Sequence, residues 1–297
     1  MAGSPQSRLW TIGEVLRWTE GHFAQKGIDS SRLDAELLLA HVLGKDRLYL
    51  YTHYDQPLSA AERENYRALV QRRARREPVA YILGQREFYG HSIEVSRDVL
   101  IPRPETEHLV DAVLEWLELH EVAAPQLADL CTGSGAIAIA LGLAVPAASV
   151  FAGEISPTAL AVARMNIERV ALASRCTLVL GDLCAVLRQC QAPPLDAIVA
   201  NPPYVADNER STLAPEILDF EPERALFAGA DGLDVIRRLC AQAWQYLRPQ
   251  GLLAMEIGSG QKDAVLDLVN RDGHYQSVRV LNDLSGRPRI MMAERDA

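Results

Sequence analysis

The stretch Asp-Leu-Cys-Thr-Gly-Ser-Gly at residues 129–135 joins an extended apolar run to the apolar segment 136–145. Its two glycines allow a tight turn and let a ligand approach the main chain closely. A strand, a glycine turn and a helix in that order are typical of an open parallel sheet, in which ligands bind beyond the carboxyl ends of the strands. The spacing Gly133-x-Gly135-x-x-Ala138 also fits a dinucleotide-binding turn, although a purely structural turn would look the same.

Strand-like and helix-like segments alternate on both sides of this turn. The residues predict strands at 127–131, 149–153, 177–180, 195–200 and 252–257, and helices at 136–145, 157–170 and 233–247. Such alternation implies a parallel sheet with helices on both faces. Two further extended runs, 276–281 and 289–293, meet through Ser285-Gly286 and predict an edge hairpin. We therefore expect an α/β fold with a Rossmann-like, mostly parallel seven-stranded sheet.

The first 85 residues indicate a small all-helical domain. Apolar residues recur at helical spacing within 11–26 and 33–40, and a glycine follows each segment. Ser59 and Glu62 form a capping box at the start of a third helix. Four arginines, at positions 72, 73, 75 and 76, end that helix. We interpret them as favourable charge at a helix C-terminus facing water, with contact to an acidic partner or RNA as the alternative.

The boundary between the two parts contains a predicted β-hairpin. Aromatic and β-branched residues surround Gly90, which favours a hairpin turn. The stretch Ile-Pro-Arg-Pro at 101–104 cannot be helical, because a residue that precedes proline is held in extended geometry. We expect a helical domain at 1–85, a β-hairpin linker at 86–102 and an α/β domain at 103–297.

Composition narrows the possible partners. Residues 1–85 carry 12 basic and 10 acidic side chains, and the rest carry 18 and 29. This acidic balance argues against a direct clamp on nucleic acid phosphates. The five cysteines lack a Cys-x-x-Cys pair and the seven histidines lack ligand spacing, which indicates reduced thiols, a cytoplasmic location and no metal site. No secretory or membrane-spanning run is present, and nothing demands an oligomer, so we expect a monomer that does not bind membranes.

Two acidic positions follow neighbouring predicted strands. Glu154 lies 19 residues after Gly135, where its carboxylate could accept both hydroxyls of a ribose. An acid that merely favours the N-terminus of the next helix is the alternative. After the following strand, Asp182 could accept from an adenine amino group while Leu183 covers the ring, although a solvated loop acid is equally ordinary.

The stretch Asn-Pro-Pro-Tyr at 201–204 follows the fourth predicted strand directly. Its two prolines fix the backbone and remove two N–H donors. The rigid turn that remains presents two acceptors, the side-chain oxygen of Asn201 and the carbonyl of Pro202, beside an aromatic ring at Tyr204. This arrangement predicts a receptor for a planar group that bears an NH2.

At this point the chain resembles the class I S-adenosylmethionine-dependent methyltransferases that modify planar amino groups through an N/D-P-P-Y/F motif. The resemblance extends to the release-factor glutamine N5-methyltransferases of the HemK/PrmC family and covers nearly the whole chain. Besides the glycine turn and Asn201–Tyr204, the family-like segments are Pro78–Gly84, Phe88–Gly90, Leu100–Glu107, Phe220–Pro222, Ala225-Leu226, Asp231–Asp234 and Glu256–Gly258.

The resemblance implies methyl transfer from S-adenosyl-L-methionine to the glutamine side-chain amide in the Gly-Gly-Gln motif of peptide chain release factors, leaving S-adenosyl-L-homocysteine. It makes 1–85 a substrate-docking domain and 103–297 the methyltransferase domain. By the family pattern the cofactor site consists of Asp129, Cys131, Thr132, Gly133, Ser134, Gly135, Glu154, Asp182, Leu183 and Asn201. The substrate-binding residues are Asn201, Pro202, Pro203 and Tyr204, of which Asn201, Pro202 and Tyr204 are the expected catalytic group. Cys131 stands where glycine is common and Glu154 where aspartate is usual.

Three other functions fit part of the pattern. An adenine-N6 methyltransferase acting on DNA or RNA would use the same turn on a flipped base, but the acidic charge argues against it. A nicotinamide-dependent dehydrogenase fits the glycine spacing and Glu154 but leaves residues 201–204 unexplained. A non-catalytic module that binds release factors would not need Asn201, Asp182 and the glycine turn together.

Overall fold

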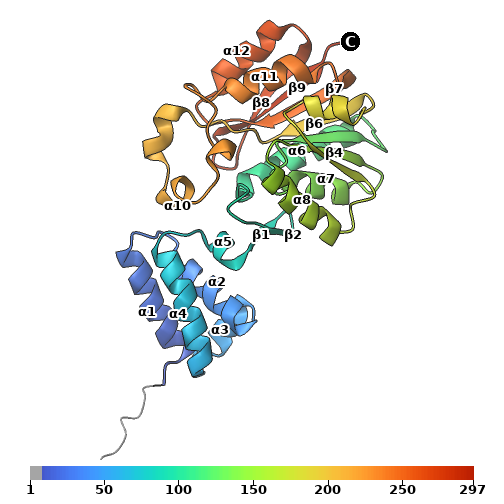
Figure 1. The fold of residues 1–297 in the computed structure, drawn as a ribbon. Coiled ribbons are helices and arrows are strands. Elements are labelled where there is room, and N and C mark those ends of the chain that lie inside the picture. Colours follow the sequence, from blue (N-terminus) through green and yellow to red (C-terminus); the bar gives the residue numbers. More distant parts are fainter. Residues whose placement is uncertain (1–8) are drawn as a thin grey trace, which may run out of the picture. The chain divides into compact units, whose positions relative to one another are not determined.

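The computed structural model describes residues 9–297, which form two compact units that divide between Gly84 and Gln85. The first unit is helical throughout, as Figure 1 shows. Its helices are α1 (Ile12–Gln25), α2 (Ser31–Leu43), α3 (Arg47–Thr52), α4 (Ala60–Ala74) and α5 (Val79–Leu83). Ser59 accepts a hydrogen bond from the Glu62 backbone N–H and Glu62 returns to the Ser59 N–H, so the predicted capping box is confirmed.

The arginines at the end of α4 do not all face water. Arg73 is only 5% exposed, and its Nε lies 2.7 Å from Oδ2 of the buried Asp34 on α2. Arg72 pairs with Glu77 at 2.8 Å, whereas Arg75 is exposed. The prediction of a water-facing cluster is therefore wrong for Arg73, because the carboxylate that it neutralises lies 39 residues away in sequence and is inside the helical core.

The second unit contains a seven-stranded sheet with the order β5-β4-β3-β6-β7-β9-β8. Its strands are β3 (Gln126–Leu130), β4 (Ser149–Glu154), β5 (Cys176–Leu180), β6 (Leu195–Ala200), β7 (Leu247–Glu256), β8 (Tyr275–Asn282) and β9 (Pro288–Arg295). The first five pair in parallel, and β9 runs antiparallel between β7 and β8. The predicted mostly parallel sheet with an edge hairpin is confirmed. The chain order reverses beside β3, which places a ligand crevice beyond the carboxyl ends of β3 and β6.

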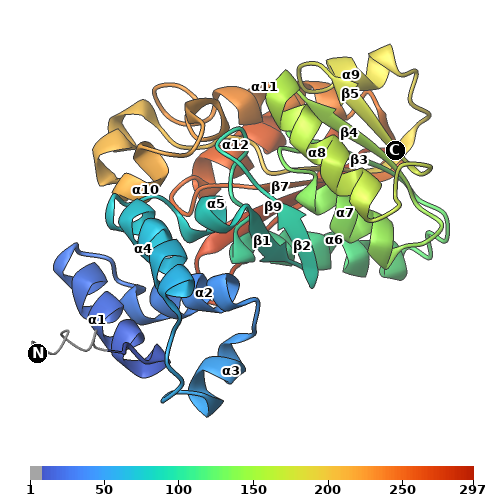
Figure 2. The same ribbon diagram turned by 60° about the horizontal axis from the view of Figure 1, so that its bottom comes forward.

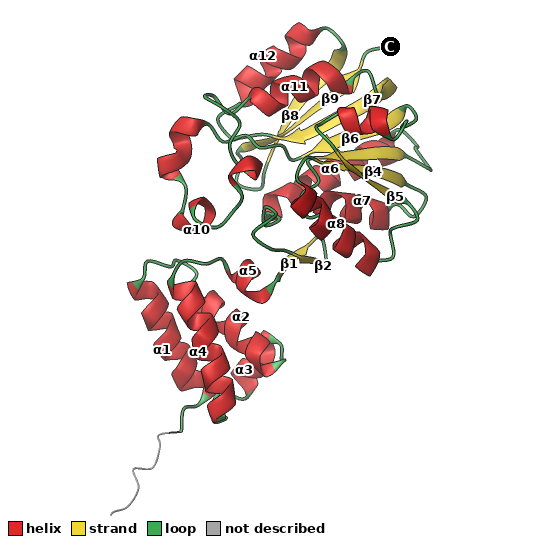
Figure 3. Cartoon of the chain, in the orientation of Figure 1, coloured by secondary structure: helices red, strands yellow, loops and turns green. Residues whose placement is uncertain are grey.

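Helices cover both faces of this sheet (Figure 3). One face carries α6 (Glu107–Leu119), α7 (Ala136–Ala144) and α8 (Pro157–Arg169), and Figure 2 shows α7 and α8 side by side. The other carries α9 (Ala185–Gln189), α11 (Asp234–Ala243) and α12 (Lys262–Asp272). A short helix, α10 (Pro215–Leu218), lies in the long connection after β6. Helices α6 and α12 and the early start of β7 were not predicted, although Gly273 ends α12 in a left-handed conformation.

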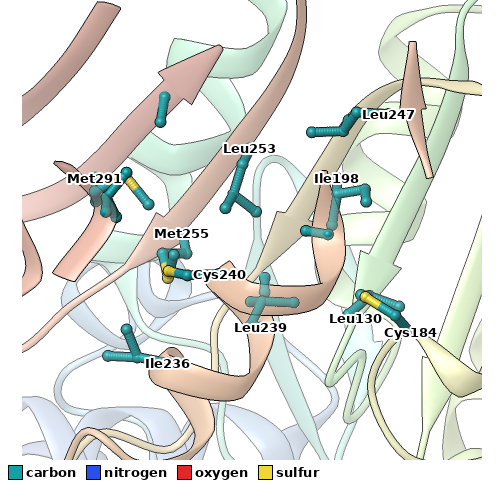
Figure 4. Packing of buried hydrophobic residues seen from close by; sticks show 14 of the residues in the cluster. Leu130, Cys184, Ile198, Ile236, Leu239, Cys240, Leu247, Leu253, Met255 and Met291 are labelled. Atoms are coloured by element: carbon teal, nitrogen blue, oxygen red, sulfur yellow. The ribbon is translucent and has the colours of Figure 1, made fainter. Parts of the chain in front are cut away.

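Apolar side chains from α11 and the central strands form one core layer (Figure 4). Leu239 and Cys240 of α11 pack with Leu253, Met255 and other fully buried residues of the sheet. All five cysteines lie within the described residues and are free. Within residues 9–297, no helix combines the length and the apolar character needed to cross a bilayer.

A small hairpin precedes the sheet and packs against helix α8. Strands β1 (Gln85–Phe88) and β2 (His91–Glu94) pair antiparallel, with Phe88 opposite His91. Asn166 of α8 accepts a hydrogen bond from the Glu94 N–H and donates one to the Glu94 carbonyl. The hairpin thus belongs to the same compact unit as the sheet.

Candidate active site

The turn after β3 depends on left-handed backbone conformations. Cys131, Gly133 and Gly135 have φ angles of 64°, 55° and 83°. A non-glycine residue adopts this region at a cost, so a glycine would fit position 131 with less strain than Cys131 does. At Gly135 an added Cβ would lie 3.4 Å from the Ala163 Cβ, so this glycine also allows close packing of α7 on α8. The turn exposes its backbone at the start of α7.

The buried carboxylate of Asp129 stabilises the turn through hydrogen bonds. Its Oδ2 accepts hydrogen bonds from the Thr132 hydroxyl at 2.5 Å and from the Ala138 backbone N–H at 3.0 Å. Its Oδ1 is buried and has no hydrogen-bond partner among the described residues. Burial raises the pKa of Asp129 to about 7, and the nearby Glu154 charge adds to the rise. Asp129 therefore holds the turn rather than lining the space above it.

Glu154 ends β4 and bridges two backbone segments. Its Oε2 accepts from the Gly133 N–H and its Oε1 from the Ser156 N–H, both at 2.9 Å, and the residue is 8% exposed. Each carboxylate oxygen can accept a second hydrogen bond. The glutamate side chain, one methylene longer than aspartate, thus fixes the glycine turn and still has acceptor capacity for a diol.

Asp182 follows β5 and is paired with a cation. Its Oδ2 lies 2.5 Å from Nη2 of Arg238 on α11. The adjacent Leu183 has a φ of 45° and is 6% exposed, so its side chain is turned inward. The ion pair joins the loop after β5 to helix α11.

The turn Asn201–Tyr204 is tied to the end of β7 by a hydrogen-bonded chain. Asn201 Nδ2 donates to the Thr106 hydroxyl at 3.2 Å, and that hydroxyl donates to Glu256 Oε2 at 2.6 Å. The Tyr204 hydroxyl donates to Glu256 Oε1 at 2.9 Å. Burial raises the pKa of Glu256, and burial beside that carboxylate also raises the pKa of Tyr204. With Nδ2 engaged, Asn201 Oδ1 is the acceptor left for a ligand.

A second buried carboxylate joins the wall of the site to the loop after α10. Glu221 Oε1 lies 2.5 Å from Nη2 of Arg103, and its Oε2 accepts from the Ile101 backbone N–H at 3.3 Å. Burial raises the pKa of Glu221, and the Arg103 charge opposes that rise. The proline-rich stretch at 101–104 is therefore part of the site.

A pocket of about 650 Å³ lies where these segments meet. That volume is within the range of small-molecule and cofactor sites. Predicted site residues that line the pocket are Cys131, Thr132, Gly133, Ser134, Glu154, Asp182, Leu183, Asn201 and Pro203. The four others, Asp129, Gly135, Pro202 and Tyr204, are not among the lining residues. The structure thus brings together predicted residues from the ends of four strands, β3, β4, β5 and β6, that are up to 72 residues apart in sequence.

Several residues of the site carried no predicted individual role. Ile155 and Arg238 line the pocket, and Thr106 and Glu256 support Asn201 and Tyr204. Ile155 is 43% exposed at the pocket, so its apolar side chain is accessible to a flat ligand. Glu256 could have been noticed as an acid at the end of a wholly apolar strand segment. Arg238 gives no such signal, because its sequence context is an ordinary amphipathic helix.

Comparisons with known proteins agree with this geometry. Residues 14–84 match the PrmC N-terminal domain, and residues 110–229 match the methyltransferase small domain. The catalytic domain of hMettl16 in complex with the MAT2A 3′UTR hairpin 6 is 19% identical, with a TM-score of 0.56 over 73% of this chain and 81% of that chain. The fold and the site define the class: a Rossmann-like methyltransferase.

Sequence similarity to two bacterial enzymes identifies the family within this class. The release factor glutamine methyltransferase of Rhodopirellula baltica is 39% identical over 99% of this chain and 100% of its own length. That of Geobacter sulfurreducens is 43% identical over 89% and 90%. This chain belongs to the release factor glutamine methyltransferase family. Membership implies that it is an enzyme that uses S-adenosyl-L-methionine.

Proposed function

We propose that this enzyme transfers a methyl group from S-adenosyl-L-methionine to the side-chain amide N5 of the glutamine in the Gly-Gly-Gln motif of peptide chain release factors. The observation that carries the proposal is the rigid turn Asn201–Tyr204 at the pocket, in which Asn201 presents an acceptor oxygen. The names of the relatives supply the class of protein substrate. The reaction would serve translation termination.

The pocket residues fit the proposed cofactor. The carboxylate of Glu154 has spare acceptor capacity for a ribose diol, and Asp182 has one for an exocyclic amine. Ile155 and Leu183 line the space between these two acids and offer apolar surface to a planar base. The glycine turn gives close access to the main chain. Cys131, Thr132, Gly133 and Ser134 would surround the remainder of the molecule, with Asp129 and Gly135 shaping the turn beneath it.

The bound cofactor supplies an electrophilic methyl group, and when nitrogen takes that methyl the electron pair of the broken carbon–sulfur bond stays on sulfur, giving S-adenosyl-L-homocysteine. An amide nitrogen is a poor nucleophile because its lone pair is delocalised into the carbonyl. Asn201 Oδ1 and the Pro202 carbonyl would accept the two amide hydrogens and stabilise positive charge on nitrogen as it develops. Holding the nitrogen in line with the methyl at about 3–3.5 Å contributes on the order of 7 kcal/mol or more. The proton then leaves to water.

The second prolyl residue and the tyrosine would shape the receptor for the glutamine. Pro203 lines the pocket, and Pro202 keeps the turn rigid. Tyr204 is held by Glu256 through its hydroxyl, which fixes the position of its ring. We propose that this ring borders the substrate amide, so that Asn201, Pro202 and Tyr204 act together.

The decisive experiment is methyl transfer with isotopically labelled S-adenosyl-L-methionine. Three substrates are compared: a folded release factor, its variant with alanine in place of the Gly-Gly-Gln glutamine, and total nucleic acid. We expect label on the intact factor alone. Label on nucleic acid alone would replace the proposed substrate with an exocyclic base amine, and label on the alanine variant would exclude the glutamine as the acceptor.

A further inference from the structure

A hydrogen-bonded chain lies behind the proposed substrate receptor and begins at Glu256. We propose that Glu256 and Thr106 are positioning residues that fix the Asn201 amide with its oxygen, rather than its nitrogen, toward the substrate. This inference rests on the proposed function, since it assigns a purpose to Asn201 Oδ1. It concerns two residues that touch Asn201 or Tyr204 and that need not touch the substrate glutamine.

Counting hydrogens gives the direction of the chain. A threonine hydroxyl has one hydrogen to donate, and an ionised carboxylate only accepts. Thr106 gives its hydrogen to Glu256 Oε2 at 2.6 Å, so its oxygen can only accept from Asn201. The donor that satisfies it is Asn201 Nδ2, at 3.2 Å. Glu256 thereby selects one of the two amide orientations.

The orientation matters because the two ends of an asparagine amide have nearly the same shape. In the reversed orientation, the Asn201 NH2 group would meet the NH2 group of the substrate. Two donors would then face each other, and the developing charge on the substrate nitrogen would lose one acceptor. A device that excludes the reversed orientation therefore acts on the rate of transfer more than on the binding of the cofactor.

The geometry of Thr106 supports a role outside its own helix. Thr106 is the N-cap residue of α6, a position where a threonine hydroxyl commonly accepts from the first turn. Here it makes no such capping bond, and its hydroxyl is turned to Glu256 on β7, which is 150 residues away in sequence. The residue is 4% exposed. Its hydroxyl thus serves the contact with β7 and Asn201.

The burial of Glu256 points the same way. Glu256 is 1% exposed and forms no ion pair among the described residues, although an isolated buried carboxylate is costly. Its two oxygens are held by the hydroxyls of Thr106 and Tyr204. One carboxylate therefore positions both Asn201, through Thr106, and Tyr204 directly. Retaining such a group at the end of an apolar strand is explained by its effect on the turn.

The test compares three variants with the wild-type enzyme. Thr106→Val removes the hydroxyl, Thr106→Ser keeps it, and Glu256→Gln can donate to Thr106 and so release the threonine hydrogen toward Asn201 Oδ1. We expect Thr106→Val and Glu256→Gln to lower kcat on a folded release factor by about 100-fold, the size of a lost transition-state contact. Thr106→Ser is expected to retain kcat within several-fold, and the cofactor Kd, measured by calorimetry, should stay within about twofold in all three.

Controls separate this role from a structural one and from failure of the proposed function. Thr177 on β5 is exposed and does not line the pocket, so Thr177→Val should leave kcat unchanged. A wild-type kcat in Thr106→Val would overturn the positioning role. An equal loss of kcat in Thr106→Val and Thr106→Ser would overturn it as well. If Thr106→Val lowers the midpoint of thermal unfolding, the positioning role is tested with the other two variants. A lower kcat in Glu256→Gln than in Thr106→Ser would support the role, and an equal kcat in the two would overturn it. A wild-type enzyme that does not label the release factor would instead contradict the proposed function.

Discussion

The amide group of Asn201 is held in place through its nitrogen, and its oxygen stays available to accept a hydrogen bond from a ligand. Its amide nitrogen is engaged by Thr106, while its oxygen remains at the pocket. The neighbouring prolines prevent the backbone from adapting to a change at this position. A defect in the Asn201 side chain should therefore affect chemistry without disturbing the cofactor end of the pocket.

We predict that Asn201→Ala lowers methyl transfer to the release factor by at least about 100-fold, because an acceptor for the developing ammonium charge is lost. Cofactor affinity should be largely unchanged. Single-turnover kinetics measure the first quantity and calorimetry the second. An Asn201→Ala enzyme with wild-type kcat would exclude the proposed mechanism.

Glu154 differs from Asn201 in having both structural and proposed binding roles. We predict that Glu154→Ala weakens S-adenosyl-L-methionine binding by about 10-fold or more, since hydrogen bonds to a charged acceptor are worth about 1.5–3 kcal/mol. Calorimetric titration measures the change. Glu154→Gln is the matched control, because it keeps one oxygen for the Gly133 N–H and so preserves more of the turn. Unchanged affinity in Glu154→Ala would remove this residue from the ribose site.

At the scale of elements, the turn after β6 is confined by the loop that precedes α11. Gly232 has a φ of 72°, and a Cβ there would lie 2.3 Å from the Tyr204 carbonyl oxygen and 3.0 Å from the Ala206 nitrogen. Gln261, the N-cap residue of α12, donates to the same Tyr204 carbonyl at 2.9 Å. Three connections far apart in sequence therefore meet at one peptide group.

We predict that Gly232→Ala lowers the free energy of unfolding by about 1–3 kcal/mol, because it adds both backbone strain and a clash with fixed main chain. It should also lower kcat, since the displaced group belongs to the Asn201–Tyr204 turn. Urea unfolding and steady-state kinetics measure the two effects. Gly260→Ala is the matched control, with no atom within 4 Å of its added Cβ. Equal behaviour of the two variants would contradict this account.

At the scale of the whole molecule, buried carboxyls make the stability of the cofactor-free enzyme depend on pH. Burial raises the pKa of Asp129 to about 7 from the ordinary 3.8, and it also raises the pKa values of Glu221 and Glu256. Between pH 3.8 and about pH 7, the carboxyl of Asp129 is protonated more often in the folded state than in the unfolded state. Stability therefore falls as pH rises through this window and levels off above the folded pKa.

We predict that the free energy of unfolding of the cofactor-free enzyme is about 1 kcal/mol higher at pH 6 than at pH 8 because of Asp129 alone. Denaturant titrations at several pH values measure the slope. Asp129→Asn removes the titrating group and should flatten the slope between pH 6 and pH 8. The same slope in both proteins would show that Asp129 does not titrate in this range.

Local patterns in the sequence determined much of the architecture and predicted nine residues that line one pocket. The alternation of strands and helices predicted the parallel sheet, the capping box at Ser59 predicted a helix start, and the position of Asn201 after a strand placed it at the pocket. These features succeed because backbone geometry and hydrophobic periodicity depend on near neighbours.

Contacts between distant residues were decided only by the tertiary structure. Arg73 meets Asp34 across 39 residues, and Thr106 meets Glu256 across 150. A side chain gives no local sign of which distant group will share its buried surroundings, because its own segment forms the same helix or strand in either case. The sequence by itself thus determined the sheet and predicted Asn201 as an acceptor at the pocket. Folding decided what holds the Asn201 side chain in place, because buried polar groups must find hydrogen-bond partners among the groups that packing brings near.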